Sequence, residues 1–154
     1  MLFALVVGYH AFSFSFLKYL IPVLLLAVPI ILSGRINGRF SLKDGALGIL
    51  VSVLILLPFW YLFSQPGKTF HLLTPGVVLF QFFGISLPEE AYFRGFLQQS
   101  LGNTLKGLLV TSILFSFMHL PQFLFYGDAY SLLTFFPSLV MGFLYLRTSS
   151  LLPS

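Results

Sequence analysis

The sequence predicts an all-α fold, a polytopic transmembrane helical bundle with about six membrane segments. Of its 154 residues, 58% are hydrophobic and only 8% are charged, and the mean hydropathy is +0.99. Soluble domains carry about 25% charged residues. The apolar stretches between polar loops also approach the roughly 20 residues that a helix needs to cross a bilayer. We therefore expect a single integral membrane domain covering residues 1–154.

Two apolar segments precede the first basic loop. Residues 2–16 form a short segment without a basic N-terminal region or a small-residue cleavage site, so we expect a retained helix rather than a signal peptide. Residues 19–32 contain Pro22 and Pro29. Neighbouring helices accommodate such prolines inside a bilayer, so this segment is also predicted to be a helix.

Four further apolar segments follow, at residues 45–63, 75–101, 107–125 and 130–146. The second of these carries most of the unusual chemistry. Pro88 is expected to bend or restart its helix, since proline removes a backbone donor. Gly102 and Asn103 then provide a helix stop.

Glu89 and Glu90 are half of the four acidic residues, and they lie side by side between apolar stretches. A charge at membrane depth costs about 2.5 to 3.5 kcal/mol on insertion scales, and such residues usually mark functional sites. Glu90 and Arg94 are four residues apart, so they can form an ion pair across one helical turn. Glu89 projects about 100° away, toward a partner such as His119. The alternative is a buried salt-bridge cluster that only ties helices together.

His119 ends the run Phe115-Ser116-Phe117-Met118-His119 in an apolar segment. An imidazole is a suitable partner for a carboxylate in moving a proton of water. His10 and His71 follow no such pattern, and for them we expect no functional role.

Several other chemistries lack the residues they need. The absence of cysteine removes a thiol nucleophile, and there is no His-Glu-x-x-His zinc motif and no Gly-x-Ser-x-Gly elbow. The basic residues are dispersed, which argues against nucleic acid as a partner. We expect no cofactor. A zinc site from Glu89, Glu90 and His119 is the disfavoured alternative, because Arg94 competes for the carboxylates.

Three stretches resemble the motifs of the CPBP intramembrane proteases, which include Rce1-type CAAX prenyl proteases and bacterial relatives associated with bacteriocin processing and immunity. These stretches are Glu89-Glu90-x-x-x-Arg94, Phe115-x-x-x-His119, and the run from Gly142 to Leu151. The resemblance places a CPBP-like core at residues 87–152. It implies an endopeptidase in which Glu89 is the general base, His119 holds and polarises the water, and Glu90 with Arg94 orients the site.

The family also has a later histidine with an asparagine four residues on, thought to stabilise the oxyanion, and no such motif occurs before Ser154. The sequence therefore predicts either a fragment or a degenerate member that keeps the fold without activity. The alternative function is a non-catalytic membrane protein for bacteriocin immunity or scaffolding, and a proton-coupled transporter is a third hypothesis. Expected partners are membrane lipids and a peptide or protein substrate, with or without a lipid group. The expected location is a prokaryotic cell membrane, with the endoplasmic reticulum membrane as the alternative.

Overall fold

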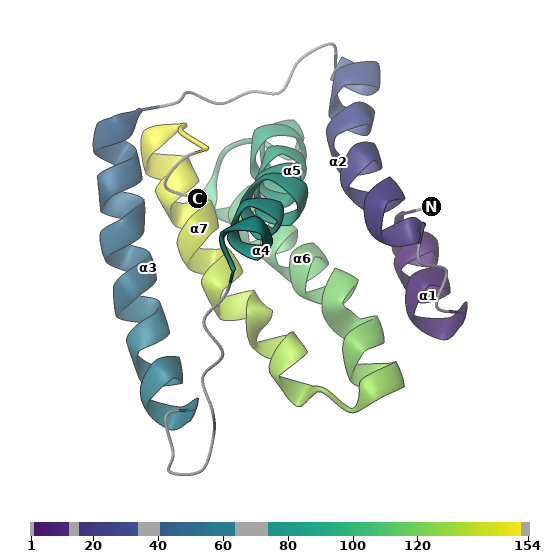
Figure 1. The fold of residues 1–154 in the computed structure, drawn as a ribbon. Coiled ribbons are helices and arrows are strands. Elements are labelled where there is room, and N and C mark those ends of the chain that lie inside the picture. The colour runs from purple at the N-terminus through teal and green to yellow at the C-terminus, as the bar shows by residue number, and fades with distance from the viewer. Residues whose placement is uncertain (1, 13–15, 34–40, 64–73, 152–154) are drawn as a thin grey trace.

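The computed structural model describes residues 2–12, 16–33, 41–63 and 74–151, which are helical apart from short turns (Figure 1). The all-α prediction is confirmed, and each of the six predicted segments contains helix. In chain order the elements are α1 (Leu2–Phe12), α2 (Leu17–Ser33), α3 (Leu42–Phe63), α4 (Pro75–Leu79), η1 (Phe80–Ser86), α5 (Leu87–Glu90), η2 (Ala91–Gln98), α6 (Leu105–Tyr126), η3 (Ala129–Thr134) and α7 (Phe135–Thr148).

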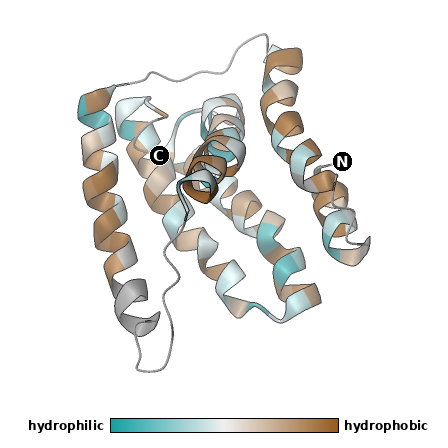
Figure 2. Ribbon diagram, in the orientation of Figure 1, coloured by the Kyte–Doolittle hydropathy of each residue, from teal (hydrophilic) through white to brown (hydrophobic). Residues whose placement is uncertain are grey.

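Many large apolar side chains of the described residues are exposed, and several polar ones are buried. Within the described residues, Leu105–Tyr126 and Ala129–Thr148 are long and apolar enough to cross a membrane, and Tyr19–Ser33 is a shorter apolar helix. Hydrophobic residues recur along α2 and α3 (Figure 2), and many large apolar side chains are exposed. The buried set contains nearly as many polar as apolar side chains, including Arg94 and Gln98. Of the buried polar side chains, Arg94 and Gln98 donate hydrogen bonds to α7, whereas the hydroxyls of Thr111 and Ser112 have no partner among the described residues.

The centre of the bundle is a hairpin of α6 and α7, which pack along each other. Gly127 ends α6 in the left-handed conformation, with φ +67°, and Asp128 caps η3 by accepting a hydrogen bond of 3.1 Å from the Tyr130 N–H. Helices α1 and α2 pack together, α1 against α6 and α2 against α5 and η2. Helix α3 lies at the opposite edge, beside α7 (Figure 1).

The four elements from Pro75 to Gln98 form one continuous helix, because the residues at their junctions keep right-handed helical dihedral angles. Its hydrogen-bond pattern alternates between α and π. The Leu87 N–H bonds to the Phe82 carbonyl five residues back, and the pattern restarts as α beside Pro88. The predicted restart is therefore observed as a change of helix type, and Pro88, which has no N–H, lies where the pattern changes. Such π turns are frequent at functional sites.

This helix ends where the sequence predicted, at Gly102, whose φ of +85° favours glycine. The next helix begins at Thr104, whose side chain accepts a hydrogen bond of 3.3 Å from the Gly107 N–H. A Cβ atom on Gly107 would collide with the carbonyl oxygen of Gly102. The turn thus holds η2 and α6 close together only because residue 107 has no side chain.

Replacing Gly107 by alanine should lower the free energy of unfolding by about 1 to 3 kcal/mol, the usual cost of overpacking. The matched control is Gly76→Ala, because a Cβ atom there meets nothing within 4 Å. That variant should keep or slightly raise stability. Denaturant unfolding in detergent micelles measures both variants, and equal stabilities would contradict the close approach.

Candidate active site

The paired glutamates occupy the short α-helical turn α5, between two π turns. The Glu90 Oε2 atom lies 3.2 Å from the Arg94 Nε atom, so the ion pair predicted from the four-residue spacing is present. Within the described residues, Glu89 makes no such ion pair. The two carboxylates therefore have different surroundings.

Arg94 is fixed on several sides, and its side chain is only 1% exposed. Its Nη2 atom donates to the Oγ atom of Ser138 at 3.1 Å and to the Ser138 carbonyl at 3.2 Å. The guanidinium carbon also lies 5.2 Å from the ring centroid of Phe115. Arg94 thus connects α5 to both α6 and α7, and it does not line the cavity that contains Glu89.

Two glutamines continue this connection between η2 and α7. The Nε2 atom of Gln98 donates to the Gly142 carbonyl at 3.0 Å, and the Nε2 atom of Gln99 donates to the Tyr145 hydroxyl at 3.0 Å. From Arg94 to Gln99 along one helix, the partners advance from Ser138 to Tyr145 along α7. The two helices therefore run parallel. A Cβ atom on Gly142 would lie 3.1 Å from Gln98 Oε1, which explains the small residue there. This polar contact fixes the rotation of the helix that carries the glutamates.

His119 lies on α6, four residues after Phe115. Its Nδ1 atom is 3.0 Å from the Phe115 carbonyl oxygen, and the two rings are stacked at a tilt, with centroids 4.8 Å apart. A carbonyl oxygen only accepts hydrogen bonds, so the Nδ1 atom of His119 carries the hydrogen. In the neutral ring, Nε2 is then an acceptor.

Glu89 and His119 line the same cavity, which has a volume of about 140 Å³. Its walls come from α1, α2, α5, η2 and α6 and consist of Val6, Tyr9, His10, Ile21, Leu25, Glu89, Phe93, Met118, His119 and Gln122. The structure therefore places the predicted base and the predicted imidazole in one cavity, whereas neither Glu90 nor Arg94 lines it. A larger cavity of about 270 Å³ between α3 and α7 is lined by no acidic residue or histidine.

Sequence reasoning missed the contribution of α1 to this cavity. His10, for which we expected no role, lies in the wall with Glu89 and His119, as do Tyr9 and Gln122. The available signal was a histidine inside an apolar helix, but nothing in the sequence indicated that α1 packs against α6. His71 lies outside the described residues.

The described part of the chain holds no group of three or more His, Asp or Glu side chains that could bind a metal ion. The expectation of a cofactor-free site remains a prediction, as do the roles assigned to Glu89, Glu90, Arg94 and His119.

The fold defines a class of all-α protein in which two of the described helices are long and apolar enough to cross a membrane and a carboxylate and an imidazole line one cavity. The chain belongs to the type II CAAX prenyl endopeptidase Rce1-like family, whose match covers residues 71–154, more than half of its length. The predicted family is thereby confirmed, and at the family level the protein is a membrane-embedded, CAAX-type protease. No curated protein and no solved structure matches the chain significantly.

Proposed function

We propose that this protein is a glutamate-dependent intramembrane endopeptidase that uses Glu89 and His119 to activate water. The observation that carries the proposal is the shared cavity, to which two separate helices contribute one carboxylate and one imidazole. A volume of about 140 Å³ holds a few water molecules, since one water occupies about 30 Å³ in the liquid. The site is therefore suited to hydrolysis.

The chemistry follows from the acceptors that face the cavity. A water molecule donates one hydrogen bond to Glu89 and one to Nε2 of His119. Its oxygen attacks the carbonyl carbon of the peptide bond while Glu89 takes the proton. The tetrahedral intermediate then breaks its C–N bond, and Glu89 returns that proton to the leaving amine. The products are a carboxylic acid and an amine, and the base is regenerated.

Glu90 and Arg94 have a positioning role in this proposal. Their ion pair and the two hydrogen bonds from Arg94 to Ser138 hold the continuous helix of α5 and η2 in one rotation, with η2 against α7. That rotation points the neighbouring Glu89 into the cavity. Side chains held in this way support the sub-ångström placement that catalysis requires.

The proposed substrate is a membrane-associated peptide, of which a prenylated peptide and a leader peptide are the two candidates. The family is described by its action on CAAX prenyl peptides, and the exposed apolar surface allows a substrate to approach through lipid. We propose a prokaryotic cell membrane as its location, with the endoplasmic reticulum membrane as the alternative.

The direct test reconstitutes the full chain in liposomes with a fluorogenic farnesylated peptide that ends in a CAAX sequence, and mass spectrometry identifies the cleaved bond. We expect wild-type cleavage and a decrease in kcat of about 100-fold to 10,000-fold for His119→Ala. Ser116→Ala, on the same helix, removes only a hydrogen bond of 3.2 Å to the Leu132 carbonyl and should keep kcat within about twofold.

Two outcomes would contradict the proposal. Cleavage that survives His119→Ala would remove the imidazole from the mechanism. No cleavage by the wild-type protein of either the farnesylated or the unmodified peptide, together with an intact biological effect of Glu89→Gln, would favour the non-catalytic immunity or scaffolding function instead.

A further inference from the structure

The side chain of Phe115 contacts two groups of the site, and the proposed mechanism gives it no role. Phe115 lies on α6, one turn before His119, and the centroids of the two rings are 4.8 Å apart at a tilt of 38°. The guanidinium carbon of Arg94, on η2, lies 5.2 Å from the centroid of the same phenyl ring. One side chain therefore joins the imidazole of the cavity to the cation of the ion pair.

The hydrogen bond of His119 leaves one rotation of its ring open. The Nδ1 atom lies 3.0 Å from the Phe115 carbonyl oxygen, and this bond fixes the position of that one atom. The torsion between the Cβ atom and the ring of a histidine has only broad preferences, so the ring can still pivot about the bond. Such a pivot changes the direction of Nε2, the acceptor that the proposed mechanism requires for water. A second contact has to fix the plane of the ring.

The phenyl ring of Phe115 supplies this second contact. Aromatic rings with centroids about 4.5 to 7 Å apart attract each other in preferred relative orientations, which restricts the rotation of both. The centroid distance of 4.8 Å to His119 is within this range. Phe115 thus holds the imidazole twice, through its carbonyl oxygen and through its ring.

The ring of Phe115 is held in turn by two buried neighbours on η2. The ring of Phe93 meets it edge-on, with centroids 5.0 Å apart at 78°. The guanidinium of Arg94 is within the distance of about 6 Å at which an aromatic face attracts a cation. Arg94 is itself fixed by its ion pair with Glu90. A continuous series of contacts therefore runs from the ion pair through Phe115 to His119.

We propose that Phe115 is a positioning residue for the reaction. Its ring fixes the plane of the His119 imidazole against the fixed guanidinium of Arg94, so that Nε2 keeps its direction toward the water. Phe115 touches neither water nor substrate in this role. The inference rests on the proposed endopeptidase function and extends the positioning role of the Glu90–Arg94 pair from Glu89 to His119.

The first measurement needs no substrate. In the full chain with isotope-labelled histidine, NMR in detergent micelles reports which ring nitrogen of His119 carries the hydrogen, and the His119→Ala spectrum assigns its signals. Wild-type protein should show one neutral form, with the hydrogen on Nδ1. Phe115→Leu keeps an apolar side chain and removes the ring, so it should add the form with the hydrogen on Nε2, because the imidazole pivots away from the carbonyl. Phe115→Tyr keeps the ring and should keep the single form.

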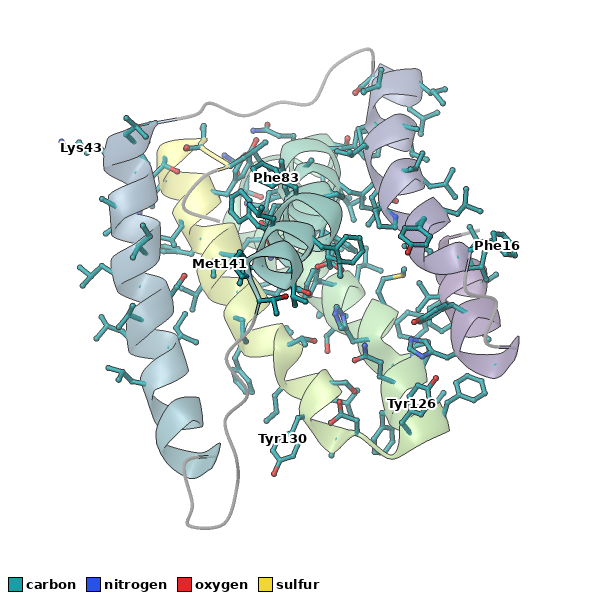
Figure 3. The ribbon with its side chains drawn as sticks, in the orientation of Figure 1. Phe16, Lys43, Phe83, Tyr126, Tyr130 and Met141 are labelled. Carbon is teal, nitrogen blue, oxygen red and sulfur yellow. The ribbon has the colours of Figure 1, made fainter. Side chains whose placement is uncertain are left out.

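The second measurement is cleavage of the fluorogenic farnesylated CAAX peptide in liposomes. Phe115→Leu should lower kcat by about 10-fold to 100-fold with KM within about twofold, since a misplacement of about 1 Å can cost about 100-fold in rate. Phe115→Tyr should recover at least about fivefold of that loss. Phe125→Leu makes the same exchange at an exposed position near the end of α6, beside Tyr126 (Figure 3), and it should leave kcat unchanged.

Combination with His119→Ala separates positioning from simple filling of space. If Phe115 acts through His119, Phe115→Leu should change the residual kcat of His119→Ala by less than about twofold, because the group it positions is already absent. A side chain that only fills space would lower kcat by the same factor in both backgrounds. Should His119→Ala leave no measurable rate, the NMR signals of Phe115→Leu decide the same question.

Each outcome decides the assignment. An unchanged His119 tautomer in Phe115→Leu, wild-type kcat in that variant, or equal losses in both backgrounds would each overturn it. If Phe115→Leu does not insert and fold, Phe115→Met makes the same comparison. A wild-type protein that cleaves nothing refutes the endopeptidase function itself, whereas cleavage that is insensitive to Phe115→Leu refutes only this inference.

Discussion

Glu89→Gln should abolish peptide cleavage while the protein still inserts and folds. Glutamine has nearly the same size as glutamate but cannot take a proton from water. The loss of a general base lowers kcat by about 100-fold to 10,000-fold. Because Glu89 lines the cavity and makes no ion pair within the described residues, its neutral replacement leaves no buried charge unpaired.

The measurement is kcat for the farnesylated peptide in liposomes, with thermal unfolding of the same preparation as a check on folding. Asp128→Asn is the matched control, since it also removes one carboxylate, from an exposed turn. It should lower the stability by no more than the loss of the capping hydrogen bond of η3, and it should leave kcat near the wild-type value. A Glu89→Gln variant with wild-type kcat would show that another group activates the water.

The ion pair between Glu90 and Arg94 could be predicted from the sequence because it depends on local geometry. The spacing of Glu90 and Arg94 specifies a pair across one turn, and the 3.2 Å contact confirms it. Helix ends were also predictable, since Gly102 adopts a positive φ that other residues avoid. These features depend on a few neighbouring residues, whose chemistry can be read directly.

Contacts between distant helices could not be predicted in the same way. Neither the packing of α1 against α6 nor the bond from Gln98 to Gly142 leaves a local signal, because both depend on how apolar helices rotate against one another. In a membrane, most faces of such helices are apolar, so hydropathy does not select the inward face. His10 was for this reason assigned no role, although it lines the cavity.

The π turns on both sides of α5 could not be predicted from the sequence either. Each π turn inserts a residue into the helical repeat and rotates the following side chains relative to a regular α-helix. In a regular α-helix from Pro75 to Gln98, the angle between the side-chain directions of Glu89 and Gln98 would therefore differ from the one observed. The placement of the carboxylate in the cavity depends on this irregularity as well as on the motif.

Arg94→Met should destabilise the fold strongly, by about 3 to 5 kcal/mol, the usual cost of leaving a buried charge without its partner. The substitution keeps a long apolar side chain but removes the ion pair with Glu90 and both hydrogen bonds to Ser138. Glu90→Gln should also be strongly destabilising, because it leaves the charge of Arg94, whose side chain is only 1% exposed, without its carboxylate. Lys106→Met removes an exposed cation from α6 and should change stability by less than about 0.5 kcal/mol.

The free energy of unfolding in detergent is measured for these variants and for the Arg94→Met/Glu90→Gln double variant. The comparison separates the effect of an unpaired charge from the effect of side-chain packing. The double variant should regain part of the lost stability, because no unpaired carboxylate remains. If Arg94→Met instead keeps wild-type stability and loses only kcat, the arginine acts on the reaction and its ion pair with Glu90 does not stabilise the packing of η2 against α7. If stability and kcat fall together while Glu89→Gln affects kcat alone, the two adjacent glutamates serve separate purposes, one for chemistry and one for position.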